Sequence, residues 1–195
     1  MLHDLVAECA TRHPDEVCLI FDSGHSEAGS QERITYSQLW QQAMELRSAF
    51  ESLSISKQIV GVYLVDGINV PAVLLGLLSS SCAFHPFNIE GLNYTCKALR
   101  QARASWILAH SQLSKQLKPL LTQLEGIEVP SDNLSKHGLQ LYKIVPSSVS
   151  SVSTGQQFNL AYSITTSGTT STPKVVLVPH ACIVPNIIDL RQPQL

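Results

Sequence analysis

The stretch QIVGVYLVDGINVPAVLLGLLSSSCAFHPF, residues 58–87, decides which fold we expect for this chain. Residues 58–64 are almost entirely apolar and show little alternation with polar residues, which is typical of a strand buried on both faces. Residues 68–80 predict an apolar helix, and residues 83–87 predict a second, short strand. A strand, a helix and another strand at this spacing indicate a parallel βαβ unit in a sheet that helices cover.

The same alternation of strands and helices extends from this unit in both directions. Toward the C-terminus we expect a helix over 92–103, a strand over 105–110, a helix over 111–125 that Pro119 could end early, and a short strand over 126–130. Toward the N-terminus we expect a helix that begins near Leu2, a hairpin over 17–36 with a long polar loop, and an amphipathic helix over 39–53 capped by Thr35 or Ser37. The expected fold is therefore α/β, with a mixed, mostly parallel sheet and flanking helices.

The composition argues against several classes of protein. The chain has 195 residues, of which 44% are hydrophobic and 14% charged, enough for one ordinary domain or for part of a larger one. A net charge of −2 gives no sign of a nucleic acid or an anionic membrane surface as a partner. The longest stretch without charged residues, 67–89, is broken by prolines, serines and a histidine, so we expect no membrane span. The first residues have no basic n-region, so no secretory signal is expected.

Cysteine usage indicates a reducing compartment. The five cysteines are an odd number, and none belongs to a C-x-x-C pair, so neither a disulfide framework nor a zinc site is expected. We therefore expect a cytoplasmic protein in which all five cysteines are small core residues.

A hydroxyl-rich segment lies between two short apolar runs, 158–164 and 174–178, that predict strands. Within 165–172 every residue except Gly168 carries a hydroxyl, and a proline and Lys174 follow. Backbone N–H groups near Gly168, the hydroxyls and the Lys174 ammonium could together hold a phosphate. A solvated surface loop could have the same composition, and the residue chemistry alone leaves both interpretations open.

A Walker A loop is an alternative that the sequence argues against. The spacing from Gly168 to Lys174 fits G-x-x-x-x-G-K, but Pro173 replaces the second glycine and has no N–H to offer a phosphate. Val175 replaces the Ser or Thr that would bind Mg²⁺. The residues after Lys174 also predict a strand, so the helix N-terminus of a Walker A site would be missing. We therefore expect this segment to connect two neighbouring strands, with no helix beginning at Lys174.

A Ser-rich stretch divides the chain. Residues 146–157 predict a flexible linker between an N-terminal α/β subdomain over 1–145 and a second part over 158–195. The second part would consist of the loop hairpin and a following helix. His180 could cap or orient the loop, but we favour a histidine that begins that helix and makes a local hydrogen bond, and the same two interpretations apply to His85.

The segment TTSGTTSTPK, residues 165–174, resembles the phosphate-binding signature of the adenylate-forming superfamily, which includes acyl-CoA synthetases, luciferases and peptide-synthetase adenylation domains. The strand and the histidine that follow that signature have counterparts in residues 174–180. Upstream segments from HPDEVCLIF to ASWILAH follow the order of the superfamily's N-terminal part, so the resemblance covers nearly the whole chain. Residues 178–187, VPHACIVPNI, are similar to acyl-CoA synthetase family member 4, the β-alanine-activating, aminoadipate-semialdehyde-dehydrogenase-like family.

This resemblance implies activation of a carboxylic acid. In the family a carboxylate attacks the α-phosphorus of ATP, giving an acyl-adenylate and pyrophosphate, and the acyl group then passes to the thiol of CoA or phosphopantetheine. The implied ligands are ATP with Mg²⁺ and a fatty acid or an amino acid such as β-alanine, and the implied partner is the remainder of the adenylation domain. The implied ATP-binding residues are Thr166, Ser167, Gly168, Thr169, Thr170, Ser171, Thr172, Pro173 and Lys174.

Two departures from the family pattern bear on activity. Ser171 stands where the family usually has glycine, which implies strain or a weaker phosphate site at that position. The chain also ends at Leu195, before the family's later motifs, so we expect the catalytic residues beyond that point and assign no metal ligand. Two interpretations stay open: part of an acid–thiol ligase, or a non-catalytic truncated form with at most weak nucleotide binding.

Overall fold

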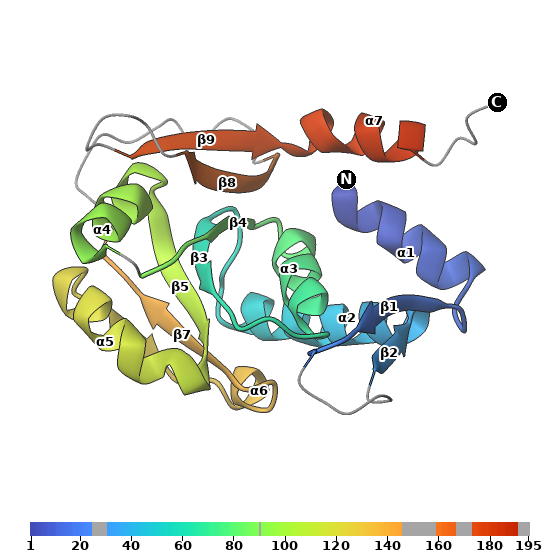
Figure 1. Cartoon of the computed structure of the whole chain (residues 1–195), viewed down its shortest axis with the longest axis horizontal. Helices are drawn as coiled ribbons and strands as arrows, with labels where there is room; N and C mark the ends of the chain where they lie inside the picture. The colour runs from blue at the N-terminus through green and yellow to red at the C-terminus, as the bar shows by residue number, and fades with distance from the viewer. Residues whose placement is uncertain (25–30, 90, 146–158, 167–172, 191–195) are drawn as a thin grey trace.

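A seven-stranded mixed sheet forms the centre of the molecule (Figure 1). A computed structural model describes residues 1–24, 31–89, 91–145, 159–166 and 173–190. The strand order is β6–β7–β5–β3–β4–β8–β9. The strands are β3 (Ile59–Tyr63), β4 (Ala83–Pro86), β5 (Ala104–His110), β6 (Ile127–Val129), β7 (Leu139–Lys143), β8 (Leu160–Thr166) and β9 (Lys174–Pro179).

Most of these strands point the same way. Strands β4 and β5 are parallel to β3 on its two sides, and β8 is parallel to β4. Strand β6 shares this direction, because it is antiparallel to β7 and β7 is antiparallel to β5. Among the strands described, β7 and β9 run the other way. The expected mixed, mostly parallel sheet is therefore confirmed.

Helices pack on both faces of the sheet and bury two separate hydrophobic clusters. The side chains of β3 alternate between the faces, so that Val60 and Val62 belong to one cluster and Ile59 to the other. The first face is covered by α2 (Tyr36–Ser52), α3 (Val70–Ser79) and α6 (Asp132–Ser135), and the second by α4 (Leu92–Gln101) and α5 (Ser114–Gln123). The 3₁₀ turn η1 (Ser111–Leu113) directly precedes α5. Burial of β3 on both faces explains its nearly uninterrupted apolar sequence.

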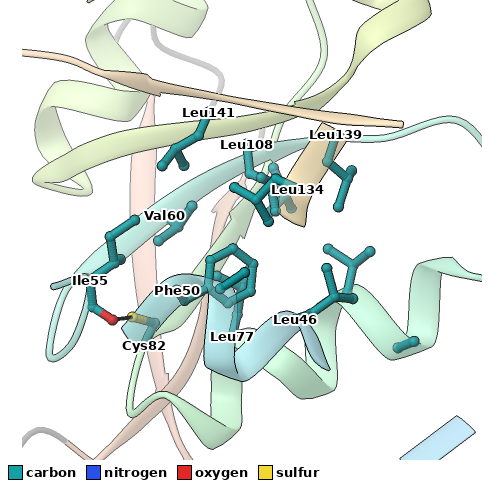
Figure 2. Close-up of a cluster of buried hydrophobic side chains, with 14 of the residues drawn as sticks. Leu46, Phe50, Ile55, Val60, Leu77, Cys82, Leu108, Leu134, Leu139 and Leu141 are labelled. Carbon is teal, nitrogen blue, oxygen red and sulfur yellow. Dashed lines mark hydrogen bonds between the residues drawn. The ribbon is translucent and has the colours of Figure 1, made fainter. Parts of the chain in front are cut away.

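Figure 2 shows how the first cluster closes over the sheet. Leu46 and Phe50 of α2 and Leu77 of α3 are each at most 1% exposed, and they lie opposite Val60 and Leu108 of the central strands. The apolar residues of α2 recur every three or four positions, so they line one face of that helix. Full burial of a side chain of this size contributes about 1.5–3 kcal/mol.

The N-terminal segment forms a small unit beside the main sheet. It consists of α1 (Leu2–Arg12) and the antiparallel strands β1 (Val17–Phe21) and β2 (Glu32–Thr35). Helix α2 begins directly after β2 with a capping box: the Gln38 N–H donates to Thr35 Oγ1 at 3.3 Å, and the Thr35 N–H donates to Gln38 Oε1 at 2.9 Å. Of the two expected caps, Thr35 is therefore the one used.

Two elements were not expected from the sequence, and a helix whose second half the sequence left uncertain is continuous. Strand β7 lies between β5 and β6, and the short helix α6 precedes it. Helix α5 continues past Pro119 to Gln123, because Leu117 and Leu120 on either side of the proline are fully buried in the second cluster. Burial of both halves outweighs the hydrogen bond that the proline removes. The linker expected at 146–157 lies outside the described residues.

The structure also bears on the expectations for the cysteines and for a membrane span. None of the five cysteines, all of which lie in described segments, forms a disulfide. Cys82 and Cys96 are buried, but Cys182 is exposed on α7 (His180–Leu190), so the expectation that every cysteine is a core residue is wrong for Cys182. Within the part of the chain that the structure describes, no helix has the length and apolar character needed to cross a bilayer.

Candidate nucleotide-binding site

The hydroxyl-rich segment closes a hairpin between the neighbouring strands β8 and β9. These strands are antiparallel, with Thr166 directly opposite Lys174. Residues 167–172 lie outside the described residues, so the structure places only Thr166, Pro173 and Lys174 of the implied ATP-binding set. Pro173 is buried, whereas Thr166 and Lys174 are exposed at the two ends of the hairpin. The Thr166 hydroxyl donates to the Lys174 carbonyl oxygen at 3.4 Å, which ties the two ends together.

No helix begins at Lys174. Strand β9 continues from Lys174 to Pro179, and α7 follows only after it. The prediction that the segment connects two neighbouring strands is therefore confirmed, and the Walker A geometry is excluded because that geometry needs a helix N-terminus at the lysine. Donors for an anion at this position would come from the hairpin's own backbone and hydroxyl groups.

A buried histidine lies beneath the start of this hairpin. His85 of β4 has no solvent exposure; its Nδ1 lies 2.9 Å from Ser163 Oγ and its Nε2 lies 3.3 Å from Thr165 Oγ1. Burial lowers the pKa of His85, while a hydrogen bond with the backbone of Ser163 acts in the opposite direction; since the pKa stays below its ordinary value, the ring is neutral at pH 7. The sequence left open whether His85 orients the loop or has only a structural role, and the signal it offered was a histidine within an apolar strand.

The hairpin contacts the rest of the sheet through few backbone pairs. Phe84 and Tyr162 are the backbone partners recorded between β4 and β8, and their rings stack with centroids 5.6 Å apart. The Tyr94 hydroxyl of α4 donates to the Thr166 carbonyl oxygen at 3.4 Å. Side chains from β4 and α4 therefore contribute much of the attachment of β8.

A hollow of about 400 Å³ opens beside the end of β8. The chain after β4 forms one wall with Phe87 and Asn88, α4 forms another with Tyr94 and Ala98, and Thr165 lies on the β8 side. Its walls combine aromatic and aliphatic surface with a few amide and hydroxyl groups, which is the usual chemistry of a small-molecule site. The hollow lies beside the start of the hydroxyl-rich segment, because Thr165 lines the hollow and directly precedes the exposed Thr166.

His180, which follows β9 directly, links the β8–β9 hairpin to helix α1 by a hydrogen bond. Its backbone N–H donates to the Asn159 carbonyl oxygen at 3.1 Å, and its Nδ1 accepts the Leu2 N–H at 3.1 Å. The His3 ring lies edge-on to it, with centroids 5.7 Å apart. Burial is the main cause that lowers the pKa of His180. His180 begins α7 as expected, but the expectation of a local partner for its side chain is wrong, because the partner comes from α1.

The described residues around the hollow contain few of the oxygen ligands that Mg²⁺ usually binds. Mg²⁺ prefers carboxylate, phosphate and water oxygens. The described residues that line the hollow offer hydroxyl, amide and apolar groups and no carboxylate, and the described part of the chain contains no cluster of three or more His, Cys, Asp or Glu residues that could hold a metal.

Comparison with known proteins agrees with this geometry. The chain matches the AMP-binding enzyme family over residues 6–194. It is 31% identical over 206 aligned residues to the β-alanine-activating enzyme of Danio rerio, and the alignment covers 98% of this chain and 17% of that protein. It is 28% identical over 196 residues to tyrocidine synthase 3 of Brevibacillus parabrevis, covering 98% of this chain and 3% of that protein. The chain thus spans less than a fifth of the length of these two relatives.

Solved structures share the fold. A fatty acyl-adenylate ligase from L. pneumophila, in complex with acyl adenylate and pyrophosphate, superposes with a TM-score of 0.68 at 20% identity, covering 97% of this chain and 32% of that one. The N-terminal subdomain of Klebsiella oxytoca NpsA superposes with a TM-score of 0.61 at 22% identity, covering 92% of this chain and 42% of that one. With the family match over nearly its whole length, the chain belongs to the AMP-binding enzyme family of adenylate-forming proteins.

Proposed function

We propose that this chain carries the phosphate-binding part of an ATP site that serves to activate a carboxylic acid as an acyl-adenylate. The observation that carries the proposal is the β8–β9 hairpin, which brings Thr166 and Lys174 opposite each other at the two ends of the hydroxyl-rich segment. Family membership supports the reaction class. The described ends of the segment supply one hydroxyl and one ammonium group on exposed positions, where a triphosphate could reach them.

The chemistry asked of residues 166–174 is positioning and charge neutralisation. A carboxylate oxygen of the acid attacks the α-phosphorus, the bond from that phosphorus to the bridging oxygen breaks, and pyrophosphate leaves with the electron pair. Negative charge accumulates on the departing phosphates, so hydroxyl and N–H donors and the Lys174 ammonium would stabilise it. Mg²⁺ bound to the phosphates would neutralise further charge, and the hollow beside Thr165 would receive a neutral or apolar part of the ligand.

The acid substrate and the acceptor are inferred from relatives. One relative is named a β-alanine-activating enzyme and others are peptide synthases, which supports an amino acid such as β-alanine as the substrate. A fatty acid is the second substrate class, since the superposed L. pneumophila protein is a fatty acyl-adenylate ligase. We infer transfer of the acyl group to a thiol, either CoA or phosphopantetheine. The division into 1–145, a linker over 146–157 and 158–195 stays part of this proposal.

An ATP titration tests the proposal. The chain should bind ATP with Mg²⁺, and Lys174→Ala should weaken binding by about tenfold, the loss expected for a charged hydrogen bond to phosphate. Lys118→Ala is the matched control, because Lys118 is an exposed lysine on α5 and makes the same change in net charge. Equal affinity for ATP in the Lys174→Ala and Lys118→Ala variants would contradict the placement of the phosphates at the hairpin.

A second assay addresses catalysis. Pyrophosphate exchange is measured with β-alanine, aminoadipate and fatty acids, on this chain and on Lys174→Ala. We expect ATP binding without exchange, because a phosphate site supplies only some of the contacts that stabilise the transition state, and each missing contact costs on the order of a hundredfold in rate. Exchange above the Lys174→Ala background would show that the 195-residue chain is an enzyme by itself.

A further inference from the structure

His85 connects the loop-bearing hairpin to the body of the sheet by side-chain hydrogen bonds. It lies on β4, has no solvent exposure, and places its two ring nitrogens against Ser163 and Thr165 of the neighbouring strand β8. Strand β8 ends one residue beyond Thr165, at Thr166, within the hydroxyl-rich segment. The backbone pairing recorded between β4 and β8 is the pair Phe84 and Tyr162, so the histidine supplies a substantial share of the polar contacts across this boundary.

We propose that His85 is a positioning residue that fixes the direction of β8 and thereby sets where the phosphate loop leaves the sheet. The consequence for ATP rests on the proposed function, whereas the effect on the hairpin does not. No contact between His85 and a ligand is implied, because the side chain is completely buried.

The hydrogen-bonding chemistry suits this role. A neutral imidazole has one N–H donor and one acceptor nitrogen, and a hydroxyl can act as either, so the two serine and threonine hydroxyls satisfy both ring nitrogens. Ser163 is itself completely buried, and a buried hydroxyl without a partner is costly. The group of three is therefore satisfied only when β8 lies at the observed distance from β4.

Two contact points on one strand determine its direction as well as its position. Ser163 and Thr165 are two residues apart, so their side chains project from the same face of β8 at points separated by about 6.6 Å. A single hydrogen bond would leave the strand free to pivot about it. Because Thr166 directly follows Thr165, a small change in the direction of β8 displaces Thr166, the last described residue before the rest of the hydroxyl-rich segment.

The inference is tested with three variants of His85 and one matched control, all in the same 195-residue chain. His85→Leu removes both hydrogen bonds, and His85→Gln keeps one donor and one acceptor. The double variant His85→Leu with Ser163→Ala also removes the buried hydroxyl that would be left without a partner, and should recover most of the lost stability. His110→Leu is the control, since His110 is a half-buried histidine on β5 that accepts the Val65 N–H at 2.9 Å, away from the hairpin.

Three measurements are made on each variant: ATP affinity by titration, stability by urea denaturation, and amide hydrogen exchange within β8 and β9. We expect His85→Leu to weaken ATP binding by about tenfold and to speed exchange mainly in the hairpin. The double variant should regain resistance to urea without regaining ATP affinity, and His85→Gln should regain part of that affinity. His110→Leu should leave both the affinity and the exchange of the hairpin unchanged.

The outcomes separate this inference from the proposed function. If the unaltered chain binds no ATP, the proposed function fails, and hydrogen exchange alone decides the role of His85. If His85→Leu leaves exchange in β8 and β9 unchanged, the inference is overturned. It is also overturned if the double variant recovers stability and ATP affinity together, because that result would mean that His85 acts only through global stability.

Discussion

Replacing Gly76 by alanine should destabilise the protein, although alanine is the better helix former. Gly76 lies in α3, where α3 packs against α2. A Cβ atom at this position would lie 2.9 Å from the Leu46 Cβ and 3.1 Å from the Ala43 carbonyl oxygen. Both are atoms of α2 that cannot rotate away, because one belongs to the backbone and the other is attached directly to it. The helices would have to separate to admit the methyl group.

The magnitude follows from two opposing effects. Overpacking of a well-packed core costs about 1–3 kcal/mol. Alanine recovers about 1 kcal/mol of helix propensity relative to glycine. The difference is a net loss of up to about 2 kcal/mol in the free energy of unfolding, and for a chain of this size each kcal/mol lowers Tm by about 2–4 °C.

Urea denaturation of Gly76→Ala is compared with that of Gly67→Ala. Gly67 lies in the β3–α3 connection, and the nearest atom to its added Cβ, the Val65 carbonyl oxygen, is 4.0 Å away. That variant should be unchanged or slightly more stable, because alanine reduces the entropy of the unfolded chain. If Gly76→Ala proved as stable as Gly67→Ala, the close approach of α2 and α3 would be refuted.

Three further predictions concern the loop, a helix cap and pH. Ser171→Gly should leave ATP affinity unharmed or strengthen it several-fold, since glycine is usual at this place in the family; a clear loss in an ATP titration would count against the alignment of the loop. Thr35→Ala should lower the free energy of unfolding by about 1 kcal/mol in urea, because it removes the capping box of α2, and an unchanged midpoint would contradict that cap. The free energy of unfolding should also fall as the pH drops below the ordinary histidine pKa of 6.5. Burial lowers the pKa of four histidines in the folded state, so the unfolded chain binds more protons below that pH. Urea unfolding at about pH 7.5 and about pH 5.5 measures this difference, and equal stabilities at the two pH values would refute it. These histidines are His3, His85, His110 and His180.

The sequence by itself determined the local elements and the character of the loop. Strand β3 was recognisable from its uninterrupted apolar run, because a strand covered on both faces has no polar alternation. Helix α2 was recognisable from the spacing of its apolar residues, and its cap was narrowed to Thr35 or Ser37, of which the structure uses Thr35. The hairpin around residues 165–174 followed from the two apolar runs beside it, and the family followed from the order of hydroxyls, proline and Lys174.

Only the tertiary structure decided which distant segments meet. Strand β7 has five residues and little local signal, and it exists because Leu139 and Leu141 are buried in the first cluster while its backbone pairs with β5 and β6. Helix α5 passes through Pro119 for a similar reason, since burial of its leucines compensates for the missing hydrogen bond. The partners of His85 lie 78 and 80 residues away along the chain. Short-range sequence patterns carry propensity and periodicity, but hydrogen bonds across such separations depend on the strand order of the folded sheet, which no local pattern specifies.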